Sequence, residues 1–153
     1  MPLSHLAFGV ENGRKTSTTD WGKEQMTMTT IAAIVYTILT GIIVSFQLGL
    51  AAGMPWGQAA MGGQYPGTFP PRLRIASLVQ VVILIALAAV VLIRADLMLA
   101  GFRSPASWAI WIVVGFAAIA TILNLITPSP LERNLWAPTS ILLLATSLMV
   151  ALL

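Results

Sequence analysis

The sequence contains no cysteine, a single histidine and very little charge. Without cysteine the chain has no disulfide, no thiolate nucleophile and no cysteine-ligated metal or iron–sulfur centre. Charged residues make up only 8% of the 153 residues and hydrophobic residues 58%, whereas a soluble domain carries roughly 25% charged residues. So few charges cannot cover a water-soluble surface. The composition therefore predicts that lipid is the solvent for most of the chain.

Four long apolar runs account for this composition, and none of them contains Asp, Glu, Lys, Arg or His. Their approximate ranges are 29–50, 75–93, 107–126 and 135–153. Each is close to the length of about 20 residues that a helix needs to cross the hydrocarbon core, and only a helix satisfies its own backbone polar groups there. The sequence thus predicts an all-α fold: an integral membrane bundle of four transmembrane helices over residues 28–153, after a polar, flexible tail over residues 1–27.

The charged residues lie between these runs, and their distribution predicts an orientation. Four spans place both termini on one side. The tail and the second loop carry five basic residues against three in the first and third loops: Arg14, Lys15, Lys23, Arg94 and Arg103, against Arg72, Arg74 and Arg133. The positive-inside rule then predicts cytoplasmic termini. Scattered positive charge suits lipid headgroups and not nucleic acid, which requires a concentrated basic face.

The first apolar run has a small residue at every fourth position: Ala33, Thr37, Gly41, Ser45, Gly49 and Gly53. Spacing of four aligns them along one helix face, where small side chains let a neighbouring backbone approach closely. We therefore predict a helix-packing ridge that includes Gly41, Ser45, Gly49 and Gly53. The ridge packs either inside the same bundle or against a second copy or a membrane partner protein.

The loop after the first run is rich in glycine, proline and aromatic residues. Glycine and proline at this density preclude a continuous helix, while Trp56, Tyr65 and Phe69 are poorly suited to a freely solvated loop. We expect the loop to fold back and cap one side of the bundle at the membrane interface, where Trp and Tyr are favoured. Either it is a structural lid or it closes a ligand site, with Trp56, Tyr65, Arg72 and Arg74 as cap and rim.

Polar side chains inside the runs converge beneath this loop. Given alternating helix directions, similar depths are predicted for Gln47, Gln80, Asn124, Thr139 and Ser140. An amide in hydrocarbon needs a hydrogen-bond partner. Two interpretations stay open: an interhelical network that fixes the helix register, or a polar pocket for a lipid headgroup or small amphiphile. On the same face, Glu132 is expected to pair with an arginine.

Groups that could perform catalysis or proton coupling are scarce. No span offers an ionisable relay of the kind that proton-coupled transporters use, and the lone histidine, His5, lies in the tail. Asp96 and Glu132 fall on opposite sides of the predicted bundle and cannot act as a carboxylate pair. We predict no cofactor, no metal site and no catalytic residues, and an enzyme is the least favoured class.

The loop motif carries a resemblance to a family. The run Gly53-Met-Pro-Trp-Gly57, the pair Gly62-Gly63 and the Pro-Arg-Leu-Arg ending at Arg74 resemble those of small bacterial four-helix integral membrane proteins. The stretch from Thr127 to Pro138 is similar to their segment before the last helix. The resemblance covers the chain from about residue 29 onward. It implies the four-helix fold and a bacterial inner-membrane location, and it implies no activity.

Small multidrug transporters also have four short helices. Their glutamate in the first helix has no counterpart between Glu24 and Arg72, so their mechanism is not implied. Three functional hypotheses follow from the sequence. The chain binds a lipid or small lipophile, or docks a membrane complex, through its loop-capped half; or it is a structural, oligomeric or accessory subunit that packs through the ridge; or it is an uncoupled carrier or channel for a small solute. Membrane lipids are the predicted partners, with a homo-oligomer or a membrane protein as a further partner.

Overall fold

A computed structural model describes residues 18–153, and the regular secondary structure of this part of the chain is entirely helical, without a strand. The long helices are α1 (Thr18–Ala52), α2 (Pro71–Arg94), α3 (Arg103–Ile126) and α4 (Pro130–Leu152). Short 3-10 turns lie in the connections: η1 (Gly57–Ala59), η2 (Met61–Gly63) and η3 (Ala100–Phe102). The predicted all-α class is therefore confirmed for the described residues.

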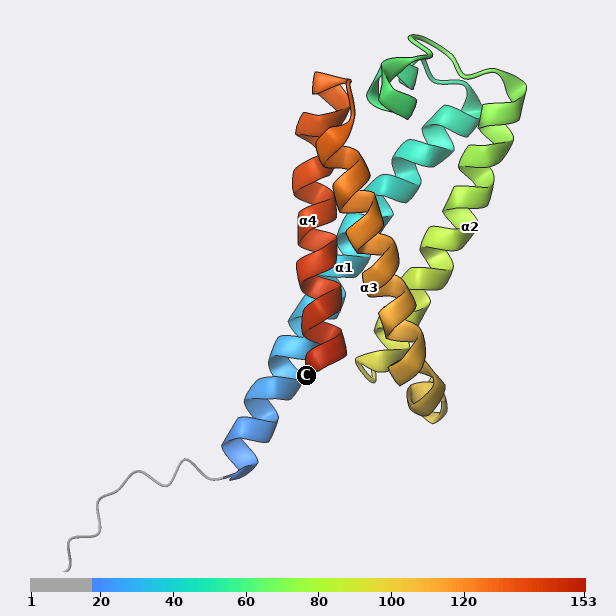
Figure 1. Cartoon of the computed structure of the whole chain (residues 1–153). Coiled ribbons are helices and arrows are strands. Elements are labelled where there is room, and N and C mark those ends of the chain that lie inside the picture. The colour runs from blue at the N-terminus through green and yellow to red at the C-terminus, as the bar shows by residue number, and fades with distance from the viewer. Residues whose placement is uncertain (1–17) are drawn as a thin grey trace, which may run out of the picture.

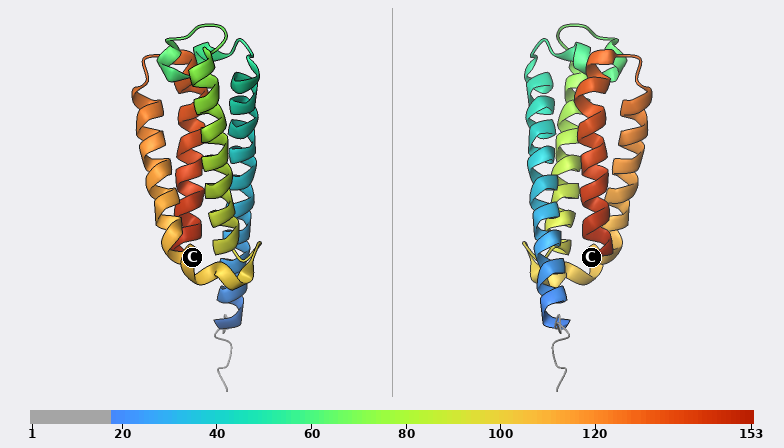
Figure 2. Two further views of the ribbon diagram at one scale, coloured as in Figure 1. Left: turned by 90° about the vertical axis from the view of Figure 1, so that its right-hand side faces the viewer. Right: turned by 90° about the vertical axis from the view of Figure 1, so that its left-hand side faces the viewer.

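The four helices run in alternating directions and form an elongated bundle (Figure 1). The α1–α2 and α3–α4 connections lie at one end, and the start of α1, the α2–α3 connection and the end of α4 lie at the other (Figure 2). Contacts are most extensive between α3 and α4 and between α1 and α2, and they are fewer between α2 and α3. The α2–α3 side is thus the least closely packed edge of the bundle.

Small and branched residues form the narrow centre of the bundle. The largest fully buried side chains include Ile110, Val113 and Val150. Only 22% to 33% of the residues in the most apolar stretch of each long helix are buried, and outward-facing residues such as Val82 and Ile112 are 68% and 70% exposed. All four helices are long and apolar enough to cross a membrane. A helix of 24 residues, such as α2, extends about 36 Å.

The helices extend beyond the predicted apolar runs because caps and prolines, not hydropathy, set their ends. Pro71 occupies the first turn of α2, where its missing N–H costs nothing. Ser129 caps α4, its hydroxyl accepting the Glu132 N–H at 3.3 Å. Residues 18–27, predicted as part of the flexible tail, are helical within α1 (Thr18–Ala52), and residues 1–17 of that tail lie outside the described part.

Candidate functional site

Residues 53–70, here named the cap segment, lie across the end of the bundle where α1 and α2 are connected (Figure 1). Three hydrogen bonds join the cap segment to the α3–α4 turn and the first turns of α4: Trp136 Nε1 donates to the Ala59 carbonyl at 2.8 Å, Ser129 Oγ to the Gln58 carbonyl at 3.2 Å, and the Gly62 N–H to Glu132 Oε2 at 2.7 Å. The cap segment is therefore fixed over the α4 side of the bundle.

Two glycines make the path of the cap segment possible. The Gly57 N–H donates to the Gly67 carbonyl at 2.9 Å, and a Cβ at position 57 would lie 2.8 Å from that oxygen and against the Tyr65 carbonyl. Gly53 ends α1 at φ +94°, a backbone conformation that favours glycine. The Arg74 guanidinium packs against Gly53, and its Nε donates to the Phe69 carbonyl at 2.9 Å.

Trp56 anchors the cap segment to α1 and does not enter the space beneath it. Its ring packs on Gly49, where any Cβ would overlap it, and stacks on Phe46 with centroids 5.9 Å apart and planes 7° from parallel. Phe46 in turn contacts Trp136, with ring centroids 4.7 Å apart. The absence of a side chain at Gly49 thus makes room for the Trp56 ring of the cap segment.

The remaining ridge residues separate into two groups. Ala33 is fully buried in the core of the bundle. Gly41 and Ser45 face outward, and a Cβ at Gly41 would meet nothing within 4 Å. Gly49 packs against Trp56 of the cap segment and Gly53 against Arg74 of α2, so the predicted packing ridge is not a single continuous contact with a neighbouring helix of this bundle.

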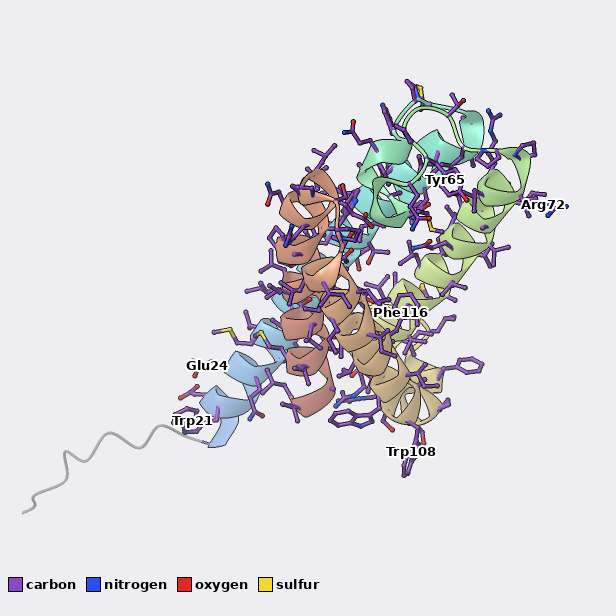
Figure 3. All side chains as sticks on the ribbon, turned by 45° about the horizontal axis from the view of Figure 1, so that its top comes forward. Trp21, Glu24, Tyr65, Arg72, Trp108 and Phe116 are labelled. Carbon is purple, nitrogen blue, oxygen red and sulfur yellow. The ribbon has the colours of Figure 1, made fainter. Side chains whose placement is uncertain are left out.

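A cavity of about 420 Å³ lies beneath the cap segment. α1 and α4 form its back, α2 and α3 its sides, and the cap segment its roof. Among the predicted site residues Gln47, Gln80 and Asn124 line it, whereas Trp56, Tyr65, Arg72 and Arg74 do not. In Figure 3 Arg72 points away from the bundle and Tyr65 lies on the cap segment.

The cavity opens sideways, between α2 and α3. Gln80 on α2 and Ile119 and Leu123 on α3 line the cavity and are themselves exposed on the outer surface. The opposite wall, formed by α1 and α4, is closed by buried residues such as Tyr36 and Leu143. A molecule can therefore reach the cavity from the lateral surface of the bundle.

The amide side chains in the cavity have no protein partner in the described part of the chain: Gln47, Gln80 and Asn124 form no hydrogen bond with residues 18–153. Gln47 is only 9% exposed. The neighbouring hydroxyl of Ser140 donates to the Ala137 carbonyl of its own helix at 3.0 Å, and that of Thr139 to the Leu135 carbonyl at 2.9 Å. The interhelical network, one of the two sequence interpretations, does not form among these groups.

Glu132 also lines the cavity, and its expected pairing with an arginine is wrong. Its Oε2 accepts hydrogen bonds from the Gly62 N–H and, at 2.9 Å, from the Thr127 hydroxyl. Arg74 instead donates a hydrogen bond to the Phe69 carbonyl of the cap segment, and Arg133 is exposed. Backbone and hydroxyl donors close to the start of α4 thus replace the guanidinium.

The sequence did not predict the aromatic residues that line the cavity, Phe69 and Trp136 among them. Phe69, 4% exposed, forms part of its roof, and Trp136 forms part of its wall. In the sequence, Phe69 stands out only as a residue unsuited to a solvated loop. Trp136 is one of five tryptophans and lies at an expected helix end, where tryptophan is favoured in any membrane helix, so the sequence alone does not single it out.

Fold and cavity together define the class of residues 18–153: an all-helical, four-helix bundle with an apolar exterior and a capped cavity that is largely apolar, carries a few polar side chains and opens laterally. No protein-family model, curated protein or solved structure matches it.

Proposed function

We propose that the bundle is inserted in a membrane, the bacterial inner membrane, with both termini on the cytoplasmic side. Aromatic rings support this placement, because exposed rings lie at both ends of the bundle, as in the interfacial belts of membrane proteins: Trp21, Phe102 and Trp108 at the terminal end, Trp56 and Tyr65 at the cap end. In the sequence, the residues before the first span and in the second loop include more basic residues than the first and third loops, which supports cytoplasmic termini.

We further propose that the chain is a non-enzymatic protein that binds an amphiphilic lipid or small lipophile in the capped cavity. The observation that carries this proposal is the set of cavity amides without a protein partner. An amide in an apolar environment without a hydrogen bond costs about 1–3 kcal/mol, so a ligand that satisfies these groups is stabilised there. The volume of about 420 Å³ falls within the range of small-molecule sites.

The lateral opening determines how such a ligand lies. Its polar head would contact Gln47, Gln80 and Asn124 beneath the cap segment, while its apolar chain leaves between α2 and α3 into the lipid phase. This route needs no aqueous path through the cap segment. It suits a molecule that is already dissolved in the bilayer.

Charge limits the chemistry of the head. Glu132 is the only charged side chain among the residues that line the cavity in the described part of the chain. The nearby arginines are engaged elsewhere or point outward, as Arg74 and Arg72 do. An anionic head would meet a carboxylate without a compensating cation. The cavity therefore favours a head that carries O–H or N–H donors and no negative charge.

Native mass spectrometry of the chain released from lipid particles tests this proposal. The wild type is expected to retain one small amphiphile, and Gln47→Leu to lose it, because leucine keeps the bulk of the side chain and removes its hydrogen bonds. Asn134→Leu is the matched control, since Asn134 is exposed on α4 and does not line the cavity. Equal retention by wild type, Gln47→Leu and Asn134→Leu would contradict a ligand in this cavity.

A second candidate function is that of an oligomeric or accessory subunit, and the outward Gly41–Ser45 surface favours it. Small outward residues let a helix of another chain approach closely, and nothing in the described bundle occupies the space beside Gly41. Gly41→Leu is expected to abolish any association through this surface, as measured by cross-linking in lipid particles. An unchanged oligomeric state would remove this candidate.

A further inference from the structure

The end of the bundle opposite the cap segment holds a second cavity, of about 340 Å³. It lies between the early turns of α1, the end of α2 and the start of α3, and Leu153 borders it. Its polar lining comes from Gln25, Thr29 and Thr30 on α1, from Arg94 and Asp96 at the end of α2, and from Arg103 at the start of α3. None of these residues belongs to the capped cavity.

A tight turn at the end of α2 brings the charged groups of this cavity together. The Asp96 N–H donates to the Ile93 carbonyl at 3.1 Å and the Leu97 N–H to the Leu92 carbonyl at 2.9 Å. Asp96 has φ +57°. This is the Schellman arrangement that commonly ends helices, with aspartate at the left-handed position. The chain reverses immediately after Arg94, so that residues on both sides of the turn face the same space.

Among residues 18–153, Arg94 finds no hydrogen-bond acceptor for its Nε. Its Nε is buried and has no hydrogen-bond partner in the described part of the chain, and no carboxylate of residues 18–153 forms an ion pair with its guanidinium. The only acidic side chain that lines the cavity, Asp96, is engaged instead by Arg103, with Oδ2 2.8 Å from Nη1. A buried guanidinium nitrogen without an acceptor is unfavourable, so an anion or another strong acceptor would be stabilised beside Arg94.

We propose that the Arg94 cavity binds a phosphate group. A guanidinium offers a planar fork of donors that matches two phosphate oxygens, and the Gln25 amide at the rim supplies a further donor. The site lies at the end of the bundle that carries the exposed rings of Trp21, Phe102 and Trp108. In a membrane-inserted bundle this is the depth of lipid headgroups, and basic pockets between helices on the cytoplasmic side suit anionic heads. The phosphate comes either from a phospholipid or from solution.

Lipid titration of the detergent-solubilised full chain, followed by native mass spectrometry, tests the proposal. Phosphatidylglycerol and diacylglycerol with identical acyl chains differ only in the phosphate-bearing head. The wild type is expected to bind phosphatidylglycerol in preference to diacylglycerol. Arg94→Gln is expected to weaken this binding roughly 10- to 100-fold, the effect of losing hydrogen bonds to a charged group. Arg72→Gln, an exposed arginine at the opposite end, is the matched control and should change binding little.

Competition with inorganic phosphate distinguishes the two sources. Displacement of the lipid by millimolar phosphate identifies a soluble phosphate site, and resistance to it identifies a headgroup site; both outcomes support the proposal. Equal binding of the two lipids would overturn the proposal. An equal loss of phosphatidylglycerol affinity in Arg94→Gln and Arg72→Gln would also overturn it. If Arg94→Gln does not fold, Gln25→Leu decides the matter, because it removes a donor from the rim of the same cavity and leaves Arg94 in place. No loss of phosphatidylglycerol affinity in that variant would then count against the site.

Discussion

A single methyl group at position 57 is expected to open the cap segment. Gly57 is buried at the point where the cap segment turns back on itself, and its N–H donates to the Gly67 carbonyl at 2.9 Å. In Gly57→Ala the new Cβ would lie 2.8 Å from the same oxygen, 3.1 Å from Phe69 Cδ1, and in overlap with the Tyr65 carbonyl. Two of these three contacts are backbone atoms, which cannot rotate away.

The magnitude follows from these contacts. Moving residue 57 away from residue 67 breaks the hydrogen bond between the Gly57 N–H and the Gly67 carbonyl, which is worth about 1 kcal/mol. Forcing a methyl group into an already close-packed site costs a further 1–3 kcal/mol, roughly. The closed cap is thus destabilised by about 2–4 kcal/mol, which corresponds to a roughly 30- to 1,000-fold increase in the open population, since each 1.4 kcal/mol is tenfold. The helices, which are stabilised by their own contacts, are expected to remain folded.

Hydrogen–deuterium exchange in lipid particles measures this opening directly. Backbone amides of residues 57–69 should exchange faster in Gly57→Ala, while those in the middle of α2 and α3 should not change. Gly115→Ala is the control, because a Cβ at this exposed position in α3 meets nothing within 4 Å. It should be neutral or stabilising by up to about 1 kcal/mol. Wild-type exchange in the cap segment of Gly57→Ala would refute the described path of the cap.

Substitutions at three further positions test the anchoring of the cap segment. Trp136→Phe removes the indole N–H that donates to the Ala59 carbonyl. The free energy needed to open residues 57–60 should fall by about 1–2 kcal/mol, and their amides should exchange faster. Glu132→Leu leaves the Gly62 N–H without its acceptor and should cost about 1–3 kcal/mol by the same measurement, whereas Glu132→Gln, which keeps an acceptor oxygen, should cost less. Gly49→Leu occupies the space of the Trp56 ring, so in a protein with Trp56 as its sole tryptophan the emission should shift to longer wavelength; unchanged emission would contradict the stacked position.

Helix number and type were predictable from the sequence because four uncharged runs of sufficient length admit one backbone solution in lipid. Helix ends were not, because hydropathy does not report capping. The polar turns of α1 around Lys23 continue the helix without adding to the apolar run. Pro71 and Ser129 start their helices several residues before the apolar residues begin.

The cavity was only half predictable. The sequence predicts that Gln47, Gln80 and Asn124 lie at similar depth, because it gives their positions along helices that run in alternating directions. The roles of the cap residues could not be predicted, because they depend on tertiary contacts that spacing cannot give. Trp56 turns toward Gly49, and Arg74 is held by the Phe69 carbonyl. Residues that appeared suited to touch a ligand thus hold the cap segment in place.

The central claim, that the capped cavity takes an amphiphile from the side, is tested most directly by fluorescence quenching. The chain has no cysteine, so single cysteines can carry a fluorophore without background. Ala120→Cys places it in the cavity, and Ile112→Cys places it on the outward face of the same helix. A nitroxide-labelled long-chain alcohol in lipid particles should quench Ala120→Cys saturably, and Gln47→Leu should abolish the saturable component, while quenching of Ile112→Cys rises linearly. Identical, unsaturable curves at both positions would show that the alcohol meets only the outer surface, and would contradict the account.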